Sequence, residues 1–347
     1  KLGLKVMLGI WLGSDGARNE IEIQRALEVI ARDADAISSV IVGNEVLLRR
    51  EMSSARLIGY IERIAKATRL PVTYADVWEF WIRHPEVATA TAFVTIHILP
   101  YWEDDPIAIE HAVAHVLNIY GEVGKHFPGK RLFIGETGWP SAGRARNGAR
   151  PGRVEQARFL RELAAAAAPV ALPFNVVEAF DQPWKRMLEG TAGGSWGLYD
   201  ERSQPKFSFA GPIEPDAQWQ RGWISAAWGG VALLAIGLAR GHRGRGLALL
   251  ALAGVCVGSL FWHQWRYAEE AARTWIEASV HGVAIATAVS AAVLIGLTIA
   301  NNAEHRAPTA APQWVERLRI AVYFGAAVVS VLLAVDPRYR DFPIALY

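Results

Sequence analysis

The fold is decided by the stretch RLFIGETGWPS, residues 131–141. It begins with a short, largely apolar run that is typical of a buried strand, and the Gly, Trp and Pro that follow cannot continue that strand. A carboxylate, Glu136, therefore stands where a strand ends, and Trp139 follows shortly after it. In parallel α/β barrels the catalytic side chains gather at the carboxyl ends of the strands. The stretch thus predicts both an architecture and a place for its chemistry.

Strand and helix patterns alternate strictly on both sides of this stretch. The predicted strands are residues 6–11, 37–42, 71–76, 93–98, 131–134 and 174–180. Such alternation predicts parallel strands joined by helical crossovers. A closed (β/α)₈ barrel needs eight strands, so we expect an α/β barrel whose first two strands precede Lys1. The rival prediction is an open doubly wound sheet, but no glycine-rich turn follows the first strand to support it.

A second glutamate has the same setting upstream. Glu45 ends the motif VGNE, residues 42–45, directly after a predicted strand. Glu45 and Glu136 are three strands apart in the predicted order, which places them across the mouth of a barrel. Glycoside hydrolysis needs such a pair, a protonated acid at the leaving oxygen and a second carboxylate, and retaining enzymes hold the two about 5 Å apart. Burial or the neighbouring charge must raise the pKa of the acid.

The two glutamate stretches carry a family resemblance. Residues 42–45 and 135–141 resemble the two signatures of family 17 glycoside hydrolases, the β-1,3-glucanases. Residues 3–9 resemble the third barrel strand of that family, and residues 196–200 resemble its closing loop. The likeness covers roughly residues 2–212 and is closest to bacterial, membrane-anchored members, some of which rearrange or branch glucan. It implies that the chain is an N-terminally truncated barrel of this family.

The resemblance also implies roles for the two glutamates. Glu45 would be the acid/base and Glu136 the nucleophile of a retaining mechanism, with no cofactor and no metal. One departure lies in FDQPWK, residues 180–185, where Gln182 stands in place of a carboxylate that plant members carry. Glu178, on the same predicted strand, could face either the barrel interior or the helices, and the pattern leaves this open.

Aromatic and polar residues at the predicted strand ends indicate a sugar ligand, because flat aromatic faces stack on pyranose rings. The expected substrate contacts are Asn44, Tyr74, His97, Tyr101, Trp102, Trp139, Phe180 and Trp184. Asn44 could hydrogen-bond a sugar hydroxyl. Tyr74 and His97 could orient hydroxyls or the nucleophile, although a single histidine on a strand is also typical of a hydrogen-bonded core residue.

The composition changes after about residue 220. Four long apolar runs follow, each long enough to span a bilayer: residues 223–239, 247–262, 278–300 and 320–335. We therefore expect a glycosidase domain over residues 1–215 and an all-α transmembrane domain over residues 220–347. Arg240, Arg243 and Arg245 make the first loop basic, and the third loop is basic too. The positive-inside rule then places both loops in the cytoplasm and the barrel in the periplasm, with the chain crossing a bacterial inner membrane several times.

Charge and cysteine content exclude other classes. The formal net charge is only +2 and no basic run with interleaved aromatics occurs, so we expect no nucleic-acid partner. A single cysteine, Cys256, argues against a disulfide framework or a metal cluster. The expected partners are β-1,3-glucan or a gluco-oligosaccharide and a lipid bilayer, and a possible glucan synthase partner stays unassigned. Two functions remain: a membrane-anchored enzyme, in which hydrolysis and transglycosylation share the same residues, or a non-catalytic glucan-binding or glucan-export component.

Overall fold

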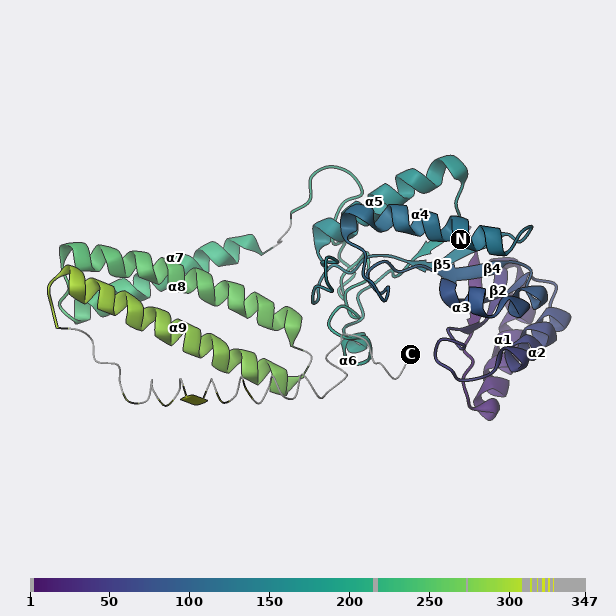
Figure 1. Ribbon diagram of the computed structural model, residues 1–347, viewed down its shortest axis with the longest axis horizontal. Coiled ribbons are helices and arrows are strands. Elements are labelled where there is room, and N and C mark those ends of the chain that lie inside the picture. The colour runs from purple at the N-terminus through teal and green to yellow at the C-terminus, as the bar shows by residue number, and fades with distance from the viewer. Residues whose placement is uncertain are drawn as a thin grey trace.

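The computed structural model describes residues 3–214, 218–272 and 274–307, together with residues 313, 317, 320, 321, 324 and 327. The chain forms an α/β part and a separate bundle of long helices (Figure 1). The strands are β1 (Val6–Ile10), β2 (Ile37–Asn44), β3 (Val72–Val77), β4 (Val94–His97), β5 (Leu132–Thr137) and β6 (Phe174–Val176). The helices around them are α1 (Gly16–Asp33), α2 (Ser54–Ala67), α3 (Trp78–Arg83), α4 (Ile109–His126), α5 (Arg153–Ala167) and α6 (Arg186–Glu189). Short 3₁₀ turns are η1 (Ala34–Ala36), η2 (Pro85–Ala90), η3 (Ala168–Val170) and η4 (Pro183–Lys185).

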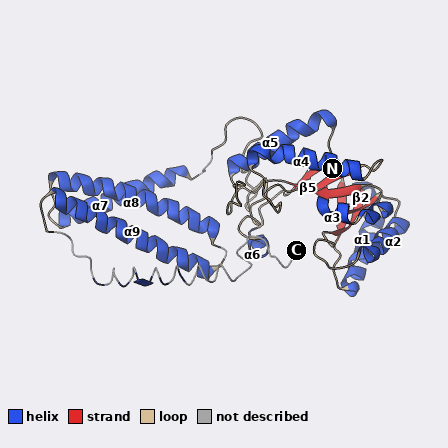
Figure 2. Cartoon of the chain, in the orientation of Figure 1, coloured by secondary structure: helices blue, strands red, loops and turns tan. Residues whose placement is uncertain are grey.

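The six strands form one sheet in which every neighbouring pair is parallel. Figure 2 shows the strands in red among the helices of the α/β part. Their spatial order is the same as their order in the chain, β1-β2-β3-β4-β5-β6. Each crossover therefore advances by one strand in the same direction, and the right-handed crossover rule places the connecting helices on one face. A doubly wound sheet would reverse direction at a switch point. The sequential order confirms the barrel-type topology over the doubly wound one.

The two edge strands face each other without pairing. Among the described residues β1 and β6 share no ladder, and closure into an eight-stranded barrel stays a prediction. The side-chain amide of Asn175 on β6 nevertheless lies 3.9 Å from the sulfur of Met7 on β1. The sheet is thus curled far enough to bring its edges together. The last strand is shorter than predicted, because after Val176 the chain turns away and only an isolated bridge joins Phe180 to Tyr199.

The main core lies between the sheet and its helices. On α2, whose first turn is capped by the hydroxyl of Ser53, the side chains of Leu57, Ile61 and Ile64 are fully buried. They pack in one cluster with the strand residues, such as Val40 on β2. Complete burial of each such side chain contributes roughly 1.5–3 kcal/mol. Strands β3 and β4 are buried at nearly every residue and so on both faces, whereas the edge strands β1 and β6 are partly exposed.

The second part contains α7 (Trp219–Ala239), α8 (Gly244–Ala271) and α9 (Trp275–Ala303). Helices α7 and α8 approach each other through small residues. A Cβ atom on Gly254 would lie 2.2 Å from the carbonyl oxygen of Gly229, and one on Gly258 would lie 2.1 Å from that of Ser225. Such contacts let the two helix backbones pack closely against each other.

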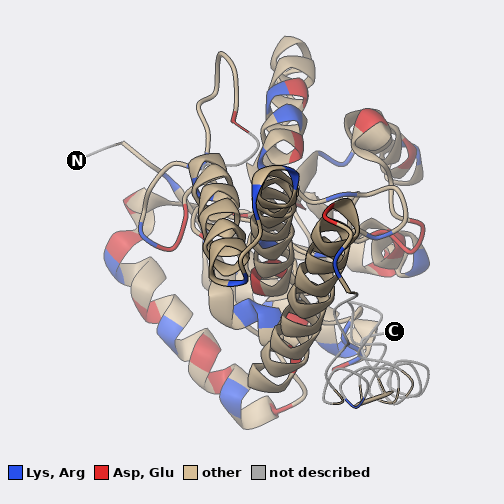
Figure 3. Cartoon of the chain, turned by 90° about the vertical axis from the view of Figure 1, so that its left-hand side faces the viewer, with Lys and Arg blue, Asp and Glu red and all other residues tan. Residues whose placement is uncertain are grey.

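These three helices are long and apolar enough to cross a membrane, judged by length and composition. Viewed from the end of the bundle, they are mostly free of charged residues, whereas the helices of the α/β part carry both signs (Figure 3). The fourth predicted run, residues 320–335, lies outside the continuously described residues.

Candidate active site

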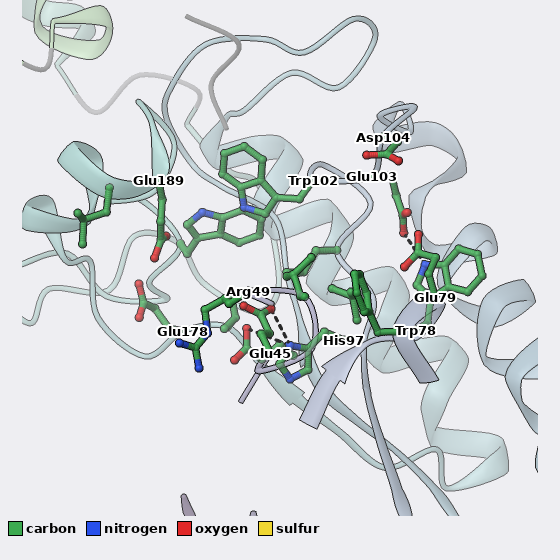
Figure 4. A pocket seen from close by; sticks show the side chains of 18 of the residues that line it. Glu45, Arg49, Trp78, Glu79, His97, Trp102, Glu103, Asp104, Glu178 and Glu189 are labelled. Carbon is green, nitrogen blue, oxygen red and sulfur yellow. Dashed lines mark hydrogen bonds and ion pairs between the residues drawn. The ribbon is translucent and has the colours of Figure 1, made fainter. Parts of the chain in front are cut away.

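The carboxyl ends of β2, β4 and β5 bring Glu45, His97 and Glu136 together. One oxygen of each carboxylate and a ring nitrogen of His97 all lie within 4.8 Å of one another. His97 Nδ1 is 3.1 Å from Glu45 Oε1 (Figure 4). The same nitrogen is 3.9 Å from Glu136 Oε2. His97 on β4 and Glu136 on β5 are register partners on adjacent strands. Glu45 directly follows β2, which is two strands away from β4 in the sheet. The geometry therefore holds two acids around one imidazole.

The backbone around both glutamates is specialised. Glu45 has φ of 52°, in the left-handed region, and its N–H donates to the carbonyl of Ala75 at 2.8 Å. A non-glycine residue in this region costs on the order of 1 kcal/mol and persists only where its surroundings demand it. Gly135 precedes the other glutamate, and a Cβ there would lie 2.6 Å from Thr95 Cγ2 and 3.1 Å from His97 Cδ2. Glycine is required at this position so that the imidazole can sit beside Glu136.

The three groups control each other's protonation. Burial alone would lower the pKa of His97, but the carboxylates of Glu136 and Glu45 outweigh it and raise that pKa to about 9. Burial raises the pKa of Glu136, Glu45 adds to the rise, and the positive charge of His97 opposes it. The imidazole is therefore protonated near neutral pH and lies as a cation between two acids. These side chains could also ligate a metal by geometry, but the proton on His97 competes with that.

The glutamates open into a cleft of about 350 Å³. Aromatic residues form its walls: Trp11, Trp78, Phe80, Trp102 and Trp196. The indoles of Trp102 and Trp196 stack with their centroids 6.1 Å apart. The guanidinium of Arg49 lies 4.4 Å from the centroid of the Trp11 ring and donates to the carbonyls of Leu12 and Asn44, which fixes that wall. The cleft can thus present flat faces to a ring-shaped ligand.

Four of the residues predicted from the sequence line this cleft: Glu45, Glu136, His97 and Trp102. The structure does not bring the others to it. Asn44 is half-buried beside Glu45 without lining the cleft, and Phe180 and Trp184 are exposed outside it. Tyr74, Tyr101 and Trp139 are at most 1% exposed and lie behind the wall. Contact of these six side chains with substrate therefore stays a prediction.

The buried aromatics support the wall instead of forming it. Tyr101 packs edge-on against Trp102 at 4.8 Å and against Trp139 at 6.1 Å. The indole N–H of Trp139 donates to the carbonyl of Arg150 at 3.0 Å. The hydroxyl of Tyr74 donates to Asp76 and accepts from the N–H of Leu47. Their spacing after a strand end identifies these residues in the sequence. That spacing does not distinguish the side chains that line the cleft from those buried behind them.

Sequence reasoning missed part of the cleft. Glu178, whose orientation the pattern left open, lines it and pairs with Lys185 at 2.8 Å. The side-chain amide of Gln182 also donates a hydrogen bond to Glu178. The residue that stands in place of the carboxylate of plant members therefore lies beside another carboxylate, four residues earlier in the chain. At the other end, burial raises the pKa of Glu79 to about 7, and the nearby charge of Glu103 adds to the rise (Figure 4). No motif signals these residues.

Comparisons with known proteins show the family of the α/β part. Residues 1–197 match the family described as the BtgE/BtgC glycoside hydrolase domain. The glucan 1,3-β-glucosidase of Arthroderma benhamiae is 25% identical over 223 residues, which cover 59% of this chain and 71% of that protein. The probable glucan endo-1,3-β-glucosidase btgC of Aspergillus flavus is 26% identical over 225 residues, but this chain spans only 32% of its length.

Solved structures of one enzyme are also similar. The family 17 β-1,3-glucanosyltransferase of Rhizomucor miehei has a TM-score of 0.53 at 26% identity, covering 59% of this chain and 75% of that one. An active-site mutant of the same enzyme in complex with laminaritriose has a TM-score of 0.54 at 25% identity, covering 62% and 78%.

Proposed function

The chain belongs to the BtgE/BtgC glycoside hydrolase domain family, and we propose that it acts on β-1,3-glucan through a retaining mechanism. The observation that carries the proposal is the separation of Glu45 and Glu136, whose facing carboxylate oxygens lie within 4.8 Å. Retaining glycosidases hold their carboxyl groups about 5–5.5 Å apart, whereas inverting enzymes leave roughly 6.5–9.5 Å for a water molecule. The names of the three relatives cited above, each of which contains β-1,3-glucan activity in its wording, support the substrate.

The proposed reaction has two displacements. Glu136 attacks the anomeric carbon and forms a glycosyl ester, while Glu45 gives its proton to the departing glycosidic oxygen. Glu45, now a carboxylate, then takes a proton from the incoming hydroxyl, whose oxygen replaces Glu136 at the anomeric carbon. Protonated His97 lies between them, and its positive charge opposes the rise that burial causes in the pKa of Glu136. Both proton and leaving group are thus accounted for by this pair.

The incoming hydroxyl belongs either to water or to a second sugar. Water gives hydrolysis, and a sugar gives transglycosylation, with the same catalytic residues in both. The stacked pair Trp102 and Trp196 offers an aromatic face near the glutamates where an acceptor sugar could rest. The similarity to a glucanosyltransferase supports transfer as one of the two outcomes.

The test follows product lengths when the full chain is incubated with β-1,3-gluco-oligosaccharides. Products longer than the substrate indicate transfer, and only shorter products indicate hydrolysis. Glu136→Gln should abolish covalent labelling by a mechanism-based inhibitor, while Glu122→Gln, on the exposed face of α4, should label like the wild type. Labelling that survives in Glu136→Gln would disprove the proposed nucleophile.

The helical bundle is proposed to anchor the enzyme in a membrane. The α/β part and the turn between α8 and α9 lie at one end of the bundle (Figure 1), and the basic loop with Arg240, Arg243 and Arg245 lies at the other. Loop charge then supports a cytoplasmic α7–α8 loop and a catalytic part outside. The reported relatives are fungal, and the assignment to a bacterial inner membrane and periplasm rests on the sequence pattern alone. Protection of a tag at Arg243 from external protease in intact spheroplasts tests the orientation.

A further inference from the structure

The short helix α6 lies on the side of the α/β part that faces the helical bundle (Figure 1). Lys185, Leu188 and Glu189, from α6 and the residue before it, line the cleft. Arg186, in the same turn, is directed to the end of α8. One terminal nitrogen of its guanidinium lies 2.7 Å from the carbonyl oxygen of Glu270 and 2.9 Å from that of Ala272. A single helical turn therefore contacts both the substrate cleft and a candidate membrane helix.

The contact satisfies groups that the helix cannot satisfy itself. The last carbonyls of an α-helix have no partner within the helix, and the negative end of its dipole attracts a cation. Arg186 supplies donor and charge at that place. Arg144 adds a weaker contact, with a terminal nitrogen 3.4 Å from the carbonyl oxygen of Ala271. Two arginines of the α/β part thus converge on one helix end.

The α/β part leaves α6 little freedom to move. A Cβ atom on Gly194 would lie 2.8 Å from Arg186 Cγ, and one on Gly193 would lie 2.6 Å from Glu189 Cβ. The two glycines therefore pack directly under α6. Lys185 joins the turn to the cleft floor through its ion pair with Glu178 at 2.8 Å. A displacement of Arg186 is consequently passed to the residues that line the cleft.

We propose that Arg186, by docking the end of α8 onto α6, makes the helical bundle a determinant of how the cleft handles its sugar. Arg186 is a positioning residue that acts through Leu188 and Glu189. This inference rests on the proposed function, because it concerns the fate of the glycosyl-enzyme. A firmly held α6 wall orders the acceptor and limits water, which favours transfer over hydrolysis and fixes the length of the products.

The experiment compares Arg186→Ala and Arg186→Lys with the wild type, each as the full chain in lipid nanodiscs. Arg161→Ala is the matched control, since Arg161 also donates to two backbone carbonyls, those of Ser208 and Gly211, away from the cleft. With β-1,3-gluco-oligosaccharides, Arg186→Ala should raise KM about threefold or more and lower the ratio of transfer to hydrolysis, with kcat for glycosyl-enzyme formation within about twofold of the wild type. Arg186→Lys should restore part of the ratio, because it keeps the cation but loses the fork.

The outcomes separate two failures. A folded wild type with no activity on the oligosaccharides would overturn the proposed function, and this role for Arg186 with it. An active wild type whose product lengths and KM are unchanged in both Arg186 variants would overturn only the role of Arg186. The same would follow if Arg161→Ala shifted the ratio as strongly as Arg186→Ala. Thermal unfolding of each variant, measured alongside, excludes a general loss of structure as the cause.

Discussion

The sheet and the helical bundle place their residues by different rules. In the sheet, buried polar side chains such as Asp76, Thr95 and His97 are held at defined strand positions and hydrogen-bonded there or nearby. In the bundle, the buried cluster is apolar, with residues such as Leu250 and Leu297, and close contact depends on glycines. In a strand, the register fixes both the position of a side chain and the direction in which it points. A uniformly apolar helix sequence specifies mainly the length of the helix. Glu45 and Glu136 therefore meet at the sheet edge, and four substitutions test this contrast.

The largest effect is expected from Glu45→Gln. Loss of a positioned acid/base should reduce kcat/KM on β-1,3-gluco-oligosaccharides by about 10²–10⁴-fold. A substrate whose leaving group needs no proton should lose much less of its kcat/KM, because the acid acts in the first displacement by protonating the leaving group. Steady-state kinetics on both substrates measure the difference. Glu277→Gln, in the first turn of α9, is the control from the bundle and should keep wild-type kinetics. Equal losses on both substrates would contradict the acid role of Glu45.

The second effect concerns His97 and stability. Its pKa is 6.5 in the unfolded chain and about 9 in the folded one, so the folded state binds the proton more tightly. The stabilisation is complete below about pH 6.5 and is lost as the pH rises through about 9. Linkage limits the loss to roughly 3 kcal/mol.

Urea unfolding of the full chain in detergent, followed between pH 6 and 10, measures this loss. His97→Asn should flatten the profile in that range. His281→Asn, in α9, should leave the wild-type slope. If the urea concentration at the unfolding midpoint of the wild type stays constant from pH 6.5 to pH 9, the two glutamates do not hold the proton on His97.

A third, smaller effect is expected from Gly135→Ala. The added methyl would press on Thr95 and His97, since a Cβ at this position would lie only 2.6 and 3.1 Å from their side chains. Overpacking of this kind costs about 1–3 kcal/mol, and a shifted imidazole should also lower kcat. Gly121→Ala on α4 is the control, because a Cβ there has no neighbour within 4 Å. Thermal unfolding and kcat are measured together. A Gly135→Ala protein as active and stable as Gly121→Ala would refute the close packing behind Glu136.

The smallest catalytic effect is expected from Gly254→Ala. A methyl there would meet the carbonyl of Gly229 at 2.2 Å and should part α7 from α8. Hydrogen exchange of the α8 amides should increase, while kcat should stay within about twofold of the wild type, because α8 keeps its contact with Arg186. Gly282→Ala, with open space around it, should change neither. A large fall in kcat would mean that the packing of α7 on α8 also shapes the cleft.

Much of the fold could be predicted because it depends on local patterns. Alternating strands and helices predict parallel strands, and the structure confirms six of them in sequential order. Glu45 and Glu136 were found because a break after an apolar run marks a strand end. The sequence also indicated three of the helices that the structure describes as long and apolar.

The remaining cleft residues depend on contacts distant in the chain. Trp139 and Trp196 both follow turns and both pack against Tyr101, yet only Trp196 lines the cleft. The carboxylate of Glu178 is held at the cleft by Lys185 and Gln182, seven and four residues later, on a turn that has no regular period. Which side of a loop an aromatic occupies is set by what packs over it, and no pattern within the loop encodes that.

The identical order of strands in space and in the chain has a consequence for assembly. A chain that folds as it is synthesised adds strands from its N-terminus. Glu45 arrives with β2, His97 with β4, and Glu136 only with β5. The imidazole of His97 is therefore in place before Glu136 joins Glu45, so the two acids need never meet without it. Strand β4 lies between the two glutamates in the chain, and it supplies the histidine that lies between them in the site.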